Sequence, residues 1–138
     1  MIKKMNRITP EKISSLNDNE IFVFGSNTEG FHGAGAAANA RQWGAKIGVG
    51  VGLSGQTYAI PTKKVVGMAL ETMFISEIKP YVDEFIRFAA LHQKYHFLVT
   101  KLGTGLAGLS MEQVAPLFKK AIYLSNISLP IEFWEILT

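Results

Sequence analysis

The stretch that decides the fold is residues 21–41, which read IFVFGSNTEGFHGAGAAANAR. It begins with a short apolar run, Ile21 to Phe24, of the kind that forms a buried strand. The next three residues, Gly25-Ser26-Asn27, are turn-forming types, so we expect the strand to end at them.

A glycine-rich loop follows this strand. Gly33-Ala34-Gly35 leads into an alanine-rich segment that predicts a helix from Ala34 to Trp43, closed by Gly44. A strand, a glycine loop and a helix start in this order aim unpaired backbone N–H groups at an anion. No acidic residue occurs between Gly30 and Leu70. We therefore predict a site for a phosphate-bearing small molecule.

Length and composition indicate one globular domain. The 138 residues are 48% hydrophobic and 18% charged, which is enough apolar material for a core. We place the core at about residues 21–137 and treat residues 1–20 as an N-terminal extension. Cysteine is absent, and no apolar run is long enough for a signal peptide core or a membrane span. These features predict a cytoplasmic protein that does not associate with membranes.

The rest of the chain alternates strand and helix patterns. The strands are expected at Thr57 to Ile60, stopped by Pro61, at Phe97 to Thr100 and at Ile131 to Ile136. Helices are expected from Lys79 to Tyr95 and after Ser110, which forms a capping-box pattern with Gln113 and is followed by a kink or tight turn at Pro116. This alternation predicts an α/β sheet with helices on both faces.

A second glycine loop, Gly103-Thr104-Gly105-Leu106-Ala107-Gly108, follows the strand that ends at Thr100. Ligands in such sheets bind outside the carboxyl ends of the strands, so both loops should lie at one edge. Either loop alone is as well explained by a tight connection that needs positive φ. Two such loops, with Glu29 as their one acidic residue, favour an anion site.

Several common chemistries are excluded. Gly33-x-Gly35-x-x-Ala38 matches a dinucleotide fingerprint only formally, because it starts too far after Phe24 and no acidic residue follows before Glu71. Three scattered histidines without partner carboxylates do not form a metal site. We expect no metal and no cofactor. The net charge of +3 comes without a Lys/Arg-rich stripe, which argues against nucleic acid as the partner.

These segments resemble the macro domain superfamily. VFGSN followed by HGAGAA is similar to the strand and first glycine loop of macro domains, and YAIPT is similar to the strand that comes next. KLGTGLAGLSMEQVAPLFKKAI resembles the second loop and its helix, and is the most specific segment. The FGSN, GAGAA, AIPTK and GTGLAG segments together are similar to a small macro-like group from bacteria and phages. The resemblance covers about residues 21–137.

The resemblance implies a three-layer α/β/α fold with a mixed sheet that binds ADP-ribose or a related nucleotide. Asn27 matches the family asparagine that contacts the distal ribose. The implied ligand-binding residues are Gly25, Ser26, Asn27, Gly33, Ala34, Gly35, Ala36, Gly103, Thr104, Gly105, Leu106, Ala107 and Gly108. The family aspartate that contacts the adenine amino group has no clear match, since Asp18 lies directly before the first strand, so the base stays open.

Three functions remain open at this point: a nucleotide-binding module, a hydrolase that removes ADP-ribose or a terminal phosphate, and an interaction domain with a vestigial site. The partner is a nucleotide such as ADP-ribose or, alternatively, an ADP-ribosylated protein. A hydrolase needs an acid or base, for which the candidates are Glu29, His32 or the phosphates of the substrate, and Asn27 would orient the distal ribose beside them. For Asn27 the alternative is a turn residue, and for His32 it is a solvated loop histidine. Lys101 could face phosphate, although a solvated lysine is more common.

Overall fold

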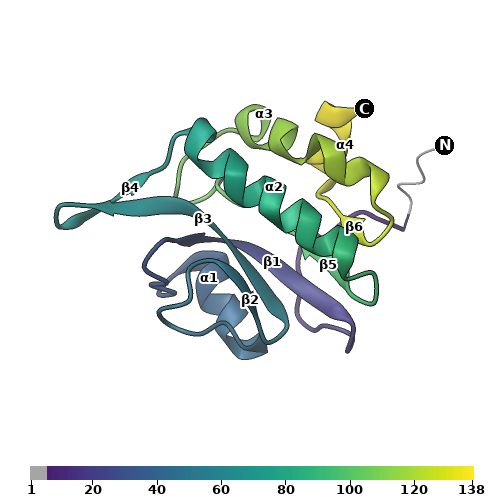
Figure 1. Cartoon of the computed structure of the whole chain (residues 1–138), viewed down its shortest axis with the longest axis horizontal. Helices are drawn as coiled ribbons and strands as arrows, with labels where there is room; N and C mark the ends of the chain where they lie inside the picture. Colours follow the sequence, from purple (N-terminus) through teal and green to yellow (C-terminus); the bar gives the residue numbers. More distant parts are fainter. Residues whose placement is uncertain (1–5) are drawn as a thin grey trace.

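The computed structural model describes residues 6–138, which form a mixed sheet with helices on both faces (Figure 1). In chain order the elements are β1 (Glu20–Asn27), α1 (Gly35–Ala40), the 3-10 segment η1 (Arg41–Trp43), β2 (Gly52–Ser54), β3 (Thr57–Val66), β4 (Ala69–Thr72), α2 (Ile75–Leu91), β5 (His96–Val99), α3 (Met111–Val114), the 3-10 segment η2 (Ala115–Tyr123), β6 (Ile127–Ser128) and α4 (Ile131–Leu137). The predicted three-layer α/β/α fold with a mixed sheet is confirmed.

The sheet has the strand order β2-β3-β1-β5-β6, and β4 pairs with β3 outside this path. β1 is parallel to both β3 and β5, and β5 is parallel to β6. β2 and β4 run antiparallel to β3. Because β1 and β5 are parallel neighbours, the loops that follow them leave the sheet at the same edge.

β1 is apolar from Ile21 to Phe24 because this part of the strand contributes to both layers of the core. Ile21 and Val23 join the larger cluster, which α2, α3, η2 and α4 cover. Phe22 and Phe24 point to the opposite face, where they pack with α1 and Trp43. Figure 1 shows α1 on one side of the sheet and the other helices on the opposite side. A strand buried on both faces is a continuous apolar run, as the sequence indicates.

Two strands extend further than predicted. β1 continues through the expected turn residues to Asn27, and β3 continues past Pro61 to Val66. Pro61 lies opposite Ser26, and the register between β1 and β3 shifts at the next residue, Asn27. Proline lacks an N–H donor and is tolerated at such an irregularity. The extension carries β3 into a hairpin with β4 that projects beyond the rest of the sheet (Figure 1).

The helices form where they are predicted except at the end of the chain, although their bounds differ. α2 runs from Ile75 to Leu91, so it both begins and ends four residues earlier than the predicted helix from Lys79 to Tyr95. The tight geometry expected near Pro116 is confirmed, because α3 gives way to the 3-10 segment η2 at Ala115. The expected strand from Ile131 to Ile136 is wrong: these residues form α4, and the short β6 closes the sheet instead. Among the helices of residues 6–138, none combines the length and apolar character that a membrane span requires.

The residues before β1 are partly built into the domain. Residues 9–16 contain no helix, and Ile8 makes a parallel bridge to Leu129. Arg7 is buried, and its guanidinium donates to the carbonyls of Ile127, Ile122 and Ala121 at 2.9, 3.0 and 3.0 Å. The segment expected to be an extension thus anchors itself to the C-terminal third of the chain.

Candidate functional site

The loops after β1 and β5 enclose a cleft of about 660 Å³, here called the main cleft. It is lined by Gly25, Ser26, Asn27, Phe31, Gly33, Ala34, Gly35, Ala36, Ala37, Thr62, Lys63, Leu70, Thr100, Lys101, Leu102, Gly103, Thr104, Gly105, Leu106 and Ala107. Every ligand-binding residue suggested by the sequence lies here except Gly108. The structure therefore brings both glycine loops together at one edge of the sheet.

The first loop is shaped by the side chain of Asn27. Its amide nitrogen donates to the Phe31 carbonyl at 2.9 Å, and its amide oxygen accepts from the Phe31 N–H at 2.9 Å. The Gly30 N–H closes the turn on the Asn27 carbonyl at 3.0 Å. Asn27 lines the main cleft, yet both ends of its amide hold the loop that places Phe31 beside the cleft.

Glu29 and His32 do not line the main cleft. Glu29 is exposed, while His32 is only 2% exposed. The His32 ring packs edge-on against Phe24 at 5.4 Å, and its Nε2 lies 3.0 Å from the Val49 carbonyl. His32 is thus neither a solvated loop histidine nor placed to act on a ligand. It fastens the first loop to the segment before β2.

The second loop is held by bonds at its two ends. The Thr104 hydroxyl donates to the Lys101 carbonyl at 2.6 Å, and the Leu109 N–H donates to the Gly103 carbonyl at 2.9 Å. The capping box predicted after the loop is present: the Ser110 N–H donates to Gln113 Oε1 at 2.9 Å, and the Gln113 N–H donates to Ser110 Oγ at 3.2 Å.

The middle of the second loop leaves its backbone donors unused. Gly105, Leu106 and Ala107 line the main cleft, and their N–H groups find no acceptor among residues 6–138. The Thr72 hydroxyl donates to the Ala107 carbonyl at 2.7 Å and so ties this part of the loop to β4. Successive free backbone N–H groups are a common feature of anion-binding sites in proteins.

Two lysines, Lys63 and Lys101, also line the main cleft. The sequence suggests only Lys101 as a candidate phosphate contact, and Lys63 was not predicted. Lys63 lies in the part of β3 beyond Pro61, which the predicted strand end had excluded. Among the described residues no carboxylate lies within ion-pair distance of Lys63. Because no acidic side chain lines the main cleft, its charged lining is entirely basic.

A second hollow of about 600 Å³, the side compartment, adjoins the main cleft. Its lining consists of Thr9, Pro10, Glu11, Lys12, Ile13, Ser14, Phe22, Gly35, Ala36, Asn39, Gln42, Thr100, Lys101 and Pro130. Four of these residues, namely Gly35, Ala36, Thr100 and Lys101, also line the main cleft. Thr9 is 7% exposed, and its buried hydroxyl oxygen has no hydrogen-bond partner among residues 6–138. This compartment could not be predicted from the sequence, because residues 9–14 reach it from before β1.

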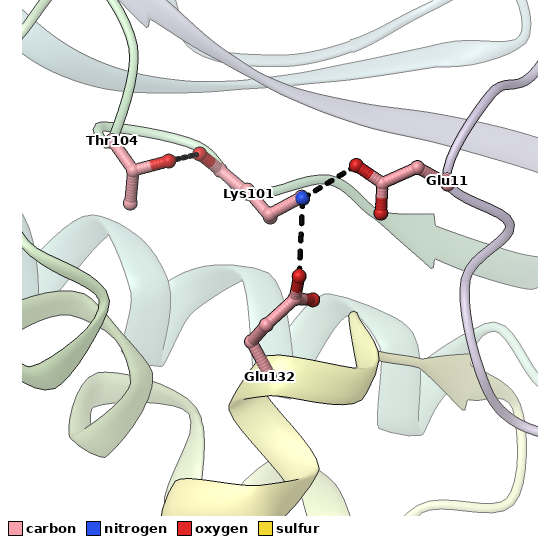
Figure 2. A network of polar contacts seen from close by, with 4 residues as sticks. All are labelled: Glu11, Lys101, Thr104 and Glu132. Carbon is pink, nitrogen blue, oxygen red and sulfur yellow. Dashed lines mark hydrogen bonds and ion pairs between the residues drawn. The ribbon is translucent and has the colours of Figure 1, made fainter.

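Lys101 connects three distant parts of the chain (Figure 2). Its Nζ lies 2.6 Å from Glu11 Oε1 and 3.2 Å from Glu132 Oε2, in α4. The hydrogen bond to Glu11 is the main reason that the pKa of Lys101 is raised. The pKa of Glu132 is lowered, first by its bond to its own backbone N–H and then by Lys101. Lys101 is therefore a fully charged cation at the boundary of the two hollows.

Exposed apolar side chains surround the mouth of the main cleft. Phe31 is 55% exposed, Leu70 is 39% exposed and Leu106 is 72% exposed, and all three line the cleft. They come from the first loop, from β4 and from the second loop. Such side chains can cover the apolar parts of a ligand whose anionic part lies on the loop donors.

Comparison with known proteins gives the fold and no activity. No protein-family model matches the chain, and no curated protein matches it. A solved structure of a protein of unknown function from Bacteroides thetaiotaomicron is similar, with a TM-score of 0.58 and 14% identity. The similarity covers 85% of this chain and 88% of that chain. Within residues 6–138, no group of three His, Asp or Glu side chains could hold a metal ion.

Proposed function

We propose that the protein binds a nucleotide that carries a diphosphate, such as ADP-ribose, with the phosphates on the second glycine loop. The proposal combines the geometry of the main cleft with the resemblance of its two glycine loops to those of macro domains. The proposed partner is the free nucleotide. The alternative partner is a protein that carries ADP-ribose as a covalent modification.

The observation that carries this proposal is the row of free N–H groups at Gly105, Leu106 and Ala107. Gly105 and Leu106 are exposed and Ala107 is half-buried, so water reaches this row in the free protein, and an anion that replaces the water can accept from successive backbone donors. Lys63 adds a positive charge along the same cleft that no carboxylate among the described residues pairs with, and no acidic side chain lines the cleft. Donors and charge together favour a phosphate over a neutral ligand.

The size and division of the site favour a two-part ligand. The main cleft and the side compartment, of about 660 and 600 Å³, are each within the usual range for small-molecule sites. They meet at Gly35 and Lys101, so one ligand can occupy both. A dinucleotide-like molecule, with a group on each side of its diphosphate, matches this division.

We favour binding over hydrolysis because the side chains needed for catalysis are elsewhere. A hydrolase needs an acid or base within hydrogen-bond reach of its water. Glu29 does not line the main cleft, and His32 is buried against Phe24. The polar side chains that do line it among the described residues are Ser26, Asn27, Thr62, Lys63, Thr100, Lys101 and Thr104.

Calorimetric titration with ADP-ribose, ADP, AMP and ribose tests the proposal. We expect saturable binding of ADP-ribose and of ADP, weaker binding of AMP, and none of ribose, because the diphosphate supplies the anion. ADP-ribose at 100 times its Kd should raise the free energy of unfolding by about 2.7 kcal/mol. The absence of binding by every phosphorylated compound would refute the proposal and leave the vestigial site as the explanation.

A separate assay addresses the hydrolase alternative. Wild-type protein is incubated with an ADP-ribosylated protein, and the release of ADP-ribose is followed against a protein-free sample. We expect binding without release above the control rate. If wild-type protein does release ADP-ribose, and neither Glu29→Gln nor His32→Ala changes the rate, the protein is an enzyme whose catalytic groups lie in the main cleft itself.

A further inference from the structure

Lys101 occupies the point where the main cleft and the side compartment meet. It lines both, and its side chain keeps 29% of its surface exposed. A ligand that fills both hollows must pass this side chain. A lysine ammonium is a compact charge with three rotatable donors, so it can exchange one acceptor for another without moving its stem.

The two carboxylates on Lys101 are held very differently. Glu132 lies in the first turn of α4, and its side chain is 33% exposed. Glu11 lies in the segment before β1, and its side chain is 73% exposed. An ion pair to so exposed a carboxylate contributes little, because water solvates the carboxylate almost as well when it leaves. Glu132 is thus the fixed partner of Lys101, and Glu11 is the exchangeable one.

We propose that Lys101 determines specificity for the anionic linker of the ligand, and that the linker replaces Glu11 on its Nζ. This inference rests on the proposed function. In the free protein Glu11 occupies the place of the ligand's negative charge, while Glu132 keeps the ammonium at the boundary. A ligand with its charge between two uncharged parts gains this contact, whereas a molecule without charge at that point cannot displace Glu11.

The proposal predicts opposite effects for the two members of the ion pair. Lys101→Met removes the ammonium and should weaken the binding of ADP-ribose and of pyrophosphate by about tenfold. Glu11→Gln removes the competing charge and should tighten both by up to about fivefold. A merely structural ion pair would not give opposite signs, because loss of either partner would affect the fold alike.

A matched surface pair provides the control. Lys79 and Asp83 on α2 form an ion pair of 2.6 Å, the same length as the Lys101–Glu11 pair, and neither lines a hollow described here. Lys79→Met and Asp83→Asn should leave both affinities unchanged. Urea denaturation of every variant shows whether it is folded, and Glu11→Gln keeps the test decisive if Lys101→Met destabilises the protein.

The outcomes separate this inference from the proposed function. If wild-type protein binds neither ADP-ribose nor pyrophosphate, the proposed function fails and this inference fails with it. If wild-type protein binds them and Glu11→Gln binds no more tightly, or Lys101→Met binds as well as wild type, the inference is overturned and the proposed function stands. Opposite shifts in the two variants, with unchanged controls, establish that the anionic linker replaces Glu11 on the Lys101 ammonium.

Discussion

Replacing Gly103 and Gly105 by alanine, one at a time, separates what the second glycine loop does for folding from what it does for binding. The two positions receive the same methyl group two residues apart. Gly103 has a φ of +80°, and a Cβ there would lie 3.4 Å from Leu109 Cδ1. Gly105 does not have a positive φ, and a Cβ there would meet nothing within 4 Å.

The difference in stability follows from these conformations. In both variants, alanine restricts the unfolded chain, and this effect alone raises the free energy of unfolding by about 0.4–1 kcal/mol. Because the contribution is the same in both variants, it cancels when they are compared. Only Gly103→Ala also places an L-residue in the left-handed region, which costs about 1–2 kcal/mol. The contact at Gly103 is ordinary van der Waals packing and adds little. We therefore expect Gly105→Ala to exceed Gly103→Ala in unfolding free energy by about 1–2 kcal/mol.

Urea denaturation measures this difference, and titration with ADP-ribose measures binding. Gly105→Ala should be at least as stable as wild type and should bind more weakly by about tenfold, because its methyl group enters space beside the free N–H groups. Two results would refute the reasoning. If Gly105→Ala is less stable than Gly103→Ala, the conformational argument is wrong. If Gly105→Ala binds ADP-ribose as tightly as wild type, Gly105 is needed only for the conformation of the loop.

Two further predictions concern polar side chains, of which Thr9 is buried and His96 is half-buried. Thr9→Val replaces a hydroxyl that is buried without a partner, so urea denaturation of the ligand-free protein should show a gain of about 1 kcal/mol; a loss would mean that the hydroxyl is paired. For His96, burial lowers the pKa below its ordinary value of 6.5, and Nε2 lies 2.7 Å from Ser128 Oγ. The unfolded chain therefore binds the proton more readily, so His96 contributes stability that is complete above the unfolded pKa and is lost as the pH falls below it. Unfolding free energies at about pH 7.5 and 5.5 should show this loss, and His96→Gln should reduce it; an equal loss in His96→Gln would assign it to other groups.

The features that could be predicted from the sequence are those that depend on neighbouring residues. The apolar run from Ile21 to Phe24 indicates a strand buried on both faces, and Ser110 with Gln113 indicates a helix start, whatever the rest of the chain does. The pairing of the two glycine loops follows from topology, because parallel neighbouring strands end at the same edge.

The features that could not be predicted depend on partners distant in sequence. β3 passes Pro61 because β4 pairs with its far half, and this extension brings Lys63 to the main cleft. The apolar residues from Ile131 to Ile136 fit a strand or a short buried helix equally well by pattern alone.

The same limit applies to the side chains of the site. His32 turns inward because its ring packs against Phe24 and its Nε2 lies within hydrogen-bond distance of the Val49 carbonyl, whereas Glu29 is exposed to solvent. Lys101 takes its place at the boundary through contacts with Glu11 and Glu132, which lie 90 and 31 residues away in the sequence. A local pattern contains no information about such distant contacts.

The anchoring of Arg7 also determines the order in which the site is completed during folding. Arg7 and the Ile127 carbonyl that it binds are separated by 120 residues, and the Arg7 carbonyl accepts from Trp134 Nε1, 127 residues away. Contacts of such long range form slowly, because the chain between them must be ordered or closed first. A growing chain therefore holds residues 9–14 unanchored until η2, β6 and α4 exist. The main cleft can assemble earlier from β1, β3 and β5, and the side compartment is the last part of the site to form.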